Sequence, residues 1–149
     1  YQHQLKQHVQ VIKNYAPTPK VWGYPDELNQ VWINLIHNAL QAMDYNGTLK
    51  IEVTEQTKYA VISITDSGIG IDDDIKPKIF EPFFSTKSTG EGIGLGLDIV
   101  KRIIDNHHGK ITVDSVVGET TFTVFLPKKP SLNIQPVKKD SNQLLLPAA

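Results

Sequence analysis

The residues most suited to chemistry form a glycine repeat that leads directly into a helical pattern. Gly92, Gly94 and Gly96 stand at every second position, and apolar residues then recur at three-four spacing as far as Ile104. Glycines let backbone approach a ligand closely, and a helix N-terminus presents unpaired N–H groups with partial positive charge. The pattern therefore suits a phosphate-binding loop. A flexible loop before a core helix would carry the same glycines, so this segment alone leaves both interpretations open.

Two asparagines stand four residues apart in the clearest helical segment, which begins at Pro25. Asn34 and Asn38 share a helix face and border its apolar stripe, although asparagine is disfavoured in helix interiors. Amide oxygens are hard ligands that suit Mg²⁺. The pair therefore predicts a magnesium site beside the core. The alternative is a pair of side chains that bond to neighbouring backbone.

One carboxylate is expected to point towards the core. Asp66 continues the inward alternation of Ile62 and Ile64, and Gly68 and Gly70 then let the chain turn away. A carboxylate directed at apolar surroundings is costly unless donors reach it. The adenine amino group would supply such a donor, whereas guanine presents a carbonyl there and would be repelled. A carboxylate that only caps the turn is the structural alternative.

An aromatic segment precedes a short polar one. Phe80, Phe83 and Phe84 are dense enough to indicate core packing, and the small, polar residues 85–90 suggest a hinged lid. Lys87 within this lid could reach a phosphate, although a solvated lysine is the common alternative.

Alternating and helical periods predict the elements that position these residues. A turn is expected at Gly118 and a helix C-cap at Gly109. The predicted strands are residues 5–15, 20–24, 49–56, 59–66, 110–115 and 121–126, with 49–56 and 59–66 paired antiparallel, and the predicted helices begin at residues 25, 72 and 95.

Composition limits the class of protein. The 149 residues are enough for one domain with its own core, and the net charge of −1 argues against nucleic acid as the main partner. Cysteine is absent, which fits a reducing compartment. No apolar run approaches the length that crosses a bilayer. The sequence does not begin with Met, and the chain is expected to be part of a longer protein. Residues 128–149 are expected to form a C-terminal tail outside the core.

Four motifs in a fixed order then point to a family. They read N-L-I-H-N-A-L-Q-A-M at 34–43, D-S-G-I-G-I at 66–71, I-F-E-P-F-F-S-T-K at 79–87 and G-E-G-I-G-L-G-L at 90–97. They are similar to the N box, first glycine box, F box and second glycine box of bacterial sensor histidine kinases. The chain thus resembles, over about residues 25–127, their catalytic and ATP-binding domain, whose wider family includes gyrase, the large ATP-driven chaperone and mismatch-repair ATPases. Neither a P-loop nor a Rossmann glycine spacing is present.

The resemblance implies an α/β sandwich of the Bergerat type over residues 1–127, in which helices cover one face of a mixed, mainly antiparallel sheet. It implies that Asn38 binds Mg²⁺, that Asn34 assists it, and that Lys87 contacts phosphate as the third catalytic residue. The family often ends in Gly-x-Gly-Thr, but here the run is one residue short, so Thr120 and Thr121 both stay open on the adenine side. The implied nucleotide-binding set is Asn38, Asp66, Gly68, Gly70, Phe80, Lys87, Gly92, Ile93, Gly94, Leu95, Gly96, Leu97 and Thr121.

The implied activity is transfer of the γ-phosphoryl group of Mg-ATP to a histidine on a separate dimerisation domain, with ADP as product and a response regulator downstream. None of the five histidines here lies in the acceptor motif, so the acceptor is expected elsewhere in the parent protein. This fragment is expected to be a cytoplasmic monomer, and the full-length protein a homodimer that could be membrane-anchored.

Three alternatives remain beside the histidine kinase. An ATP hydrolase of this family carries a water-activating Glu four residues before the Mg²⁺ ligand, where this chain has Asn34. A non-catalytic nucleotide-binding or scaffolding domain would keep the motifs without transfer. A serine kinase acting on an anti-sigma partner is the third, and the Phe-rich box fits it less well.

Overall fold

The computed structural model describes residues 9–15, 20–82 and 95–128. The expected lid, Phe83, Phe84 and the tail from 129 onwards lie outside the described residues. The described elements are β1 (Val9–Tyr15), α2 (Pro25–Ala42), β2 (Gly47–Glu55), β3 (Tyr59–Asp66), a 3₁₀ turn (Lys76–Lys78), α3 (Leu95–Asn106), β4 (Lys110–Val116) and β5 (Glu119–Pro127).

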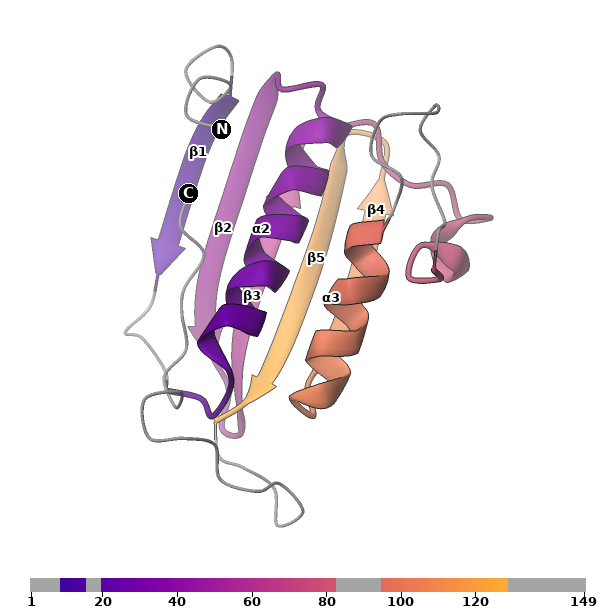
Figure 1. Ribbon diagram of the computed structural model, residues 1–149. Coiled ribbons are helices and arrows are strands. Elements are labelled where there is room, and N and C mark those ends of the chain that lie inside the picture. The colour runs from indigo at the N-terminus through magenta and orange to yellow at the C-terminus, as the bar shows by residue number, and fades with distance from the viewer. Residues whose placement is uncertain (1–8, 16–19, 83–94, 129–149) are drawn as a thin grey trace.

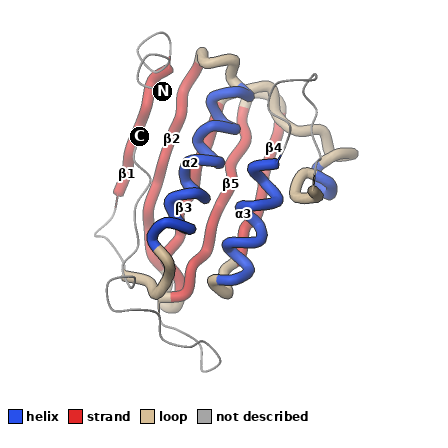
Figure 2. Tube along the Cα trace, in the orientation of Figure 1, coloured by secondary structure: helices blue, strands red, loops and turns tan. Residues whose placement is uncertain are grey.

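Five strands form one mixed sheet in the order β1-β2-β3-β5-β4. β1 runs parallel to β2, and the remaining neighbours are antiparallel. Because parallel neighbours need a crossover, α2 must connect β1 to β2 across a face of the sheet. Helices α2 and α3 lie side by side on one face (Figure 1), and Figure 2 shows them as a single layer over the strands. The expected sandwich is confirmed.

Helix α2 forms where the sequence predicts it. Pro25 occupies its first turn, where a missing N–H costs nothing, and Asp26 and Glu27 complement the positive end of the helix dipole. Each large apolar side chain that it buries contributes roughly 1.5–3 kcal/mol. The buried side chains are Leu28, Val31, Trp32, Leu35, Ile36, Ala39 and Leu40.

Helix α3 ends differently from the expectation. Gly109 was the predicted cap, but His108 takes the left-handed conformation, with φ of 60°. The His108 N–H donates to the Asp105 carbonyl at 3.0 Å and the Gly109 N–H donates to the Ile104 carbonyl at 2.9 Å. This is a Schellman ending. Gly109 is needed for a different reason, because a Cβ there would collide with the Phe125 carbonyl on β5.

The predicted strand at residues 20–24 does not form. Val21 is buried, yet the segment pairs with no strand. The Tyr24 N–H instead donates to Nε2 of His107 at 3.0 Å. This segment is therefore held by a side chain at the end of α3 and not by a ladder of backbone hydrogen bonds.

The predicted helix at residues 72–79 is reduced to the single 3₁₀ turn Lys76–Lys78. Pro77 lies inside this segment and has no N–H to donate, so a regular α-helical ladder cannot continue through it. The chain makes isolated turns here, such as the Lys76 N–H to the Asp72 carbonyl at 3.1 Å.

The two faces of the sheet differ in character. The face beneath the helices is apolar and almost fully buried, with Ile51, Ile62 and Val124 at its centre. The outer face carries hydroxyl pairs such as Thr65 with Thr121. In the described part of the chain no helix is long and apolar enough to cross a membrane.

Candidate functional site

Asp66 ends β3 and lies on the helix-facing side of the sheet, with 3% of its surface exposed. The Gly68 N–H donates to its Oδ1 at 2.8 Å. Burial raises the pKa of the Asp66 carboxyl from 3.8 to about 6, and the Gly68 hydrogen bond partly opposes that rise. At neutral pH the group is therefore mainly ionised, and it remains a buried acceptor. The sequence prediction that this carboxylate points inwards is confirmed, and it also caps the turn.

The loop after Asp66 is built on glycines that nothing larger could replace. A Cβ on Gly68 would collide with the Ala42 carbonyl at the end of α2. Gly70 has φ of 85°, and a Cβ there would lie 2.6 Å from the Val116 carbonyl oxygen. The Gly118 N–H also donates to the Gly68 carbonyl at 3.1 Å. The loop is thus fixed between α2 and the β4–β5 hairpin, beside the buried carboxylate.

The two asparagines of α2 use their amide nitrogens in different ways. Asn34 Nδ2 donates to the Gly96 carbonyl of α3 at 3.1 Å, and Asn34 Oδ1 accepts from Gln30 Nε2 at 2.6 Å. Asn38 Nδ2 donates to the Asn34 backbone carbonyl at 2.9 Å. Asn34 therefore connects α2 to the first turn of α3. In Asn38 the nitrogen is engaged with backbone, and the amide oxygen is the atom left for a ligand.

The strand register separates the two candidate threonines. Thr120 lies directly opposite Asp66 in the β3–β5 pair, so both side chains project from the helix-facing side. Thr120 is 3% exposed. Thr121 projects from the other side, where its Oγ1 lies 2.9 Å from Thr65 Oγ1. Of the two hydroxyls, only that of Thr120 shares a face with the carboxylate.

A serine that the sequence reading did not single out joins this group. Ser115 Oγ lies 2.6 Å from Thr120 Oγ1 and accepts a hydrogen bond from the Ile71 N–H at 2.8 Å. Its signal was available in the sequence, because Ser115 continues the inward alternation of Ile111 and Val113 just as Asp66 continues that of β3.

Three other predicted binding residues make contacts within the described part of the chain. The Phe80 ring packs edge-to-face on Phe122, with centroids 6.3 Å apart. Gly96 contacts Asn34, and Leu97 packs against the core. Leu95 begins α3, and its side chain is not described. The predicted residues Lys87, Gly92, Ile93 and Gly94 lie outside the described residues.

Asn34 of α2 thus contacts the start of α3, and the end of α2 contacts the glycine loop beside the buried carboxylate. Residues 23–130 match the family described as "Histidine kinase-, DNA gyrase B-, and HSP90-like ATPase". The chain belongs to this family. Within it, the match to named histidine kinases identifies a catalytic, ATP-binding domain of the histidine kinase type.

Curated relatives cover most of this domain but are much longer. Sensor histidine kinase ZraS of Escherichia coli (strain K12) is 44% identical over 110 residues, which are 73% of this chain and 23% of that protein. Sensory histidine kinase/phosphatase NtrB of Rhodobacter capsulatus is 35% identical over 139 residues, covering 83% of this chain and 38% of that protein. The ATPase domain thus corresponds to a minor part of each relative.

Solved structures share the fold. The catalytic domain of histidine kinase ThkA has a TM-score of 0.76 and 33% identity, covering 87% of this chain and 83% of that one. Full-length ShkA in complex with AMPPNP has a TM-score of 0.72 and 25% identity, covering 82% of this chain and 26% of that one. These likenesses confirm the expected arrangement of sheet and helices.

Proposed function

We propose that this domain binds Mg-ATP and transfers its γ-phosphoryl group to a histidine on a separate dimerisation domain. The observation that carries the proposal is the buried Asp66 carboxylate, fixed beside a glycine-built loop at the end of β3. Family membership adds the reaction class, and the AMPPNP complex of ShkA supports an adenine nucleotide as ligand.

The base pocket selects adenine through Asp66. Its ionised carboxylate accepts from the adenine amino group, while the guanine carbonyl at the same place would meet negative charge. Gly68 and Gly70 let the pocket wall approach the base because they carry no side chain. Thr120 is the threonine of this pocket, since its hydroxyl is buried on the Asp66 side of the sheet.

A magnesium ion fits the residues of α2. Asn38 would hold it through the amide oxygen, with few protein ligands and mostly water, as Mg²⁺ prefers. The described residues contain no group of three or more His, Cys, Asp or Glu that could form another cation site. When bound, the ion neutralises phosphate charge during transfer. Asn34 keeps α2 against α3 so that the phosphate-binding helix start stays in place.

The histidine kinase reaction fits better than ATP hydrolysis by this domain. A hydrolase needs a base to activate water, and Asn34 occupies that position as a neutral amide bonded at both ends. Phosphoryl transfer to an external nucleophile needs mainly positioning and charge neutralisation. Lys87 is proposed as a further phosphate contact, and Gly92, Ile93, Gly94, Gly96 and Leu97 as backbone donors.

The partners follow from this reaction. The acceptor histidine is supplied by another part of the parent protein, and a response regulator then receives the phosphoryl group. We place the domain in the cytoplasm, where ATP is available, as a monomer that acts within a dimeric kinase. Nucleic acid is not a proposed partner, given the net charge of −1.

Calorimetric titration of ATP and GTP, with and without Mg²⁺, tests the site. ATP should bind in a magnesium-dependent way and more tightly than GTP. Asp66→Asn should weaken ATP binding by about tenfold to a hundredfold, the value of a hydrogen bond to a charged group. Asp114→Asn removes an exposed carboxylate from β4 and is the matched control. A folded wild-type domain that binds no ATP would overturn the proposal.

Transfer is tested by adding a separately produced helical domain that carries an acceptor histidine, together with γ-labelled ATP. The proposal expects acid-labile label on that histidine and ADP in solution. Rapid ADP release without an acceptor would favour the hydrolase, and ATP binding without transfer would favour the scaffolding alternative.

The threonines can be separated by one pair of variants. Thr120→Val should weaken ATP binding by about threefold to tenfold, the value of one neutral hydrogen bond. Thr121→Val alters the neighbouring hydroxyl on the opposite face. A larger effect at Thr121 than at Thr120 would favour Thr121, which the implied nucleotide-binding set includes.

A further inference from the structure

The β4–β5 hairpin is attached to the glycine loop by a side chain as well as by backbone. Ser115 lies on β4, and its Oγ accepts the Ile71 N–H at 2.8 Å. The Gly118 N–H at the hairpin tip donates to the Gly68 carbonyl at 3.1 Å. The serine therefore belongs to a connection between the wall of the base pocket and the strand that carries Thr120.

The hydrogen-bond inventory of Ser115 limits the orientation of Thr120. A hydroxyl has one proton and two acceptor lone pairs. Ser115 uses an acceptor position for the Ile71 N–H, and its Oγ lies 2.6 Å from Thr120 Oγ1. If Ser115 gives its proton to Thr120, both serine functions are satisfied and the Thr120 O–H is free to donate into the pocket. If Thr120 instead gave its proton to Ser115, the Thr120 hydroxyl could only accept hydrogen bonds from a ligand.

Donation from Ser115 to Thr120 makes the pair of Asp66 and Thr120 complementary to adenine. Thr120 is the cross-strand partner of Asp66, so its hydroxyl lies beside the accepting carboxylate on the same face of the sheet. Adenine presents an amino donor next to the acceptor nitrogen N1, whereas guanine presents a carbonyl next to an N–H. A carboxylate acceptor together with a hydroxyl donor matches adenine at both positions and guanine at neither.

We propose that Ser115 is a positioning residue that fixes the Thr120 hydroxyl as a donor towards N1 of adenine. Ser115 does not touch the nucleotide, and it acts through the Ile71 N–H and Thr120. The inference rests on the proposed ATP site and adds to it a determinant of base specificity. Replacing Ser115 should reduce the preference for a base that has an acceptor nitrogen at N1, beyond any general loss of affinity.

A ligand comparison separates positioning from general support. ATP and 1-deaza-ATP, in which a C–H replaces N1, are titrated into the same domain. The wild type should bind ATP about threefold to tenfold more tightly than 1-deaza-ATP. In Ser115→Ala the two affinities should come within about twofold of each other. Ser115→Thr keeps the hydroxyl and should restore the wild-type ratio.

Two further variants keep the test decisive. Ser115→Cys is close in size and a weak donor, so it should reduce the ratio even if the alanine variant fails to fold. Ser63→Ala removes a hydroxyl from the outer face of the sheet, where Ser63 Oγ lies 3.5 Å from Thr123 Oγ1, and should keep the full ratio.

The outcomes distinguish this inference from the proposed function. The positioning role would be overturned if the Ser115 variants lost affinity for ATP and 1-deaza-ATP equally. It would also be overturned if the wild type bound the two ligands with the same affinity. The ATP site would then still stand on the Asp66→Asn titration. Failure of the wild type to bind ATP would instead remove the proposed function.

Discussion

Asp66 combines a proposed specificity role with a cost in stability. Its carboxyl is buried beneath the helices and receives the Gly68 N–H, which leaves part of its desolvation uncompensated. The raised pKa, about 6, reflects that imbalance. A ligand donor would complete the site, so the feature that disfavours the empty fold is the one proposed to recognise adenine.

The stability of the domain should therefore depend on pH through Asp66. Because the pKa is raised from 3.8 to about 6 in the folded state, folding favours the protonated form. The stabilisation that protonated Asp66 gives to the folded state is fully present below about pH 4 and is lost as the pH rises through about 6. Two pKa units correspond to about 3 kcal/mol of unfolding free energy.

Asp66→Asn tests this linkage. The amide oxygen can still accept the Gly68 N–H, while the titrating group is gone. At about pH 8 the unfolding free energy of the variant, measured by urea denaturation, should be up to about 3 kcal/mol higher than that of the wild type. The difference should shrink towards about pH 4. Asp114→Asn should change the unfolding free energy by less than about 0.5 kcal/mol at each pH. Parallel curves for wild type and Asp66→Asn would contradict the prediction.

At the scale of elements, both helices end in left-handed residues that are not glycine. Asp44 after α2 has φ of 52° and His108 after α3 has φ of 60°. A residue with a Cβ is strained in this conformation. His108→Gly should therefore raise the unfolding free energy by about 0.5–1 kcal/mol, whereas His108→Ala should give no gain. Chemical denaturation of the two variants checks this, and equal behaviour would argue against a strained helix end.

Besides the apolar packing of α2 and α3, a side-chain hydrogen bond from Asn34 joins α2 to the first turn of α3. Asn34→Asp replaces the donor to the Gly96 carbonyl with a carboxylate oxygen and should cost about 1–3 kcal/mol. Hydrogen exchange should become faster in the first turn of α3. Gln30→Ala removes only the exposed partner of Asn34 and should cost less than about 0.5 kcal/mol. Equal losses of unfolding free energy in the two variants would show that the Asn34–Gly96 hydrogen bond stabilises the fold no more than the Gln30–Asn34 hydrogen bond.

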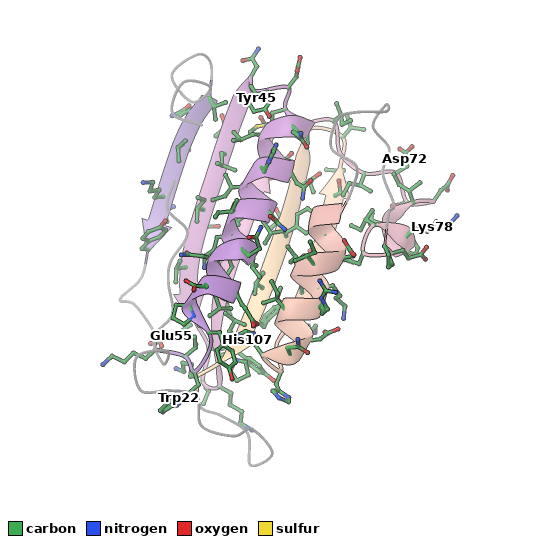
Figure 3. The ribbon with its side chains drawn as sticks, in the orientation of Figure 1. Trp22, Tyr45, Glu55, Asp72, Lys78 and His107 are labelled. Atoms are coloured by element: carbon green, nitrogen blue, oxygen red, sulfur yellow. The ribbon has the colours of Figure 1, made fainter. Side chains whose placement is uncertain are left out.

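On the scale of the whole molecule, the proposed base pocket and the His107 contacts that support the fold lie at opposite ends. Figure 3 labels Tyr45 at one end and His107 at the other. At the Tyr45 end, β2 begins at Gly47, and Leu49 pairs with Asp66. At the other end, His107 Nδ1 donates to the Ile103 carbonyl at 2.8 Å, and Nε2 accepts from the Tyr24 N–H at 3.0 Å.

His107→Ala should consequently separate stability from binding. The variant leaves a cavity and an unpaired Tyr24 N–H, so it should lose about 2–4 kcal/mol of unfolding free energy. ATP affinity measured by calorimetry should stay within about twofold of the wild-type value, because the proposed base pocket is at the other end. The exposed neighbour variant His108→Ala is the control. A large loss of affinity in folded His107→Ala would show that the two ends are coupled.

The sequence reveals the part of the candidate site that follows a local pattern. Asp66 was recognised because a charged residue continued an apolar alternation. Ser115 and Thr120 follow the same rule on β4 and β5, but hydroxyls are common in strands and their polarity attracts less notice. The shortened motif leaves Thr120 and Thr121 both open, because a motif has no information about which face a strand residue takes.

The sequence by itself determined the helices and strands with clear periods, the inward direction of Asp66, the family and the order of its motifs. These features depend on residues close together in the chain. Only the tertiary structure decided that residues 20–24 attach through His107, that Asn34 joins α3, and that Thr120 faces Asp66. Each depends on pairing between distant segments, where a shift of one residue in register moves a side chain to the opposite face.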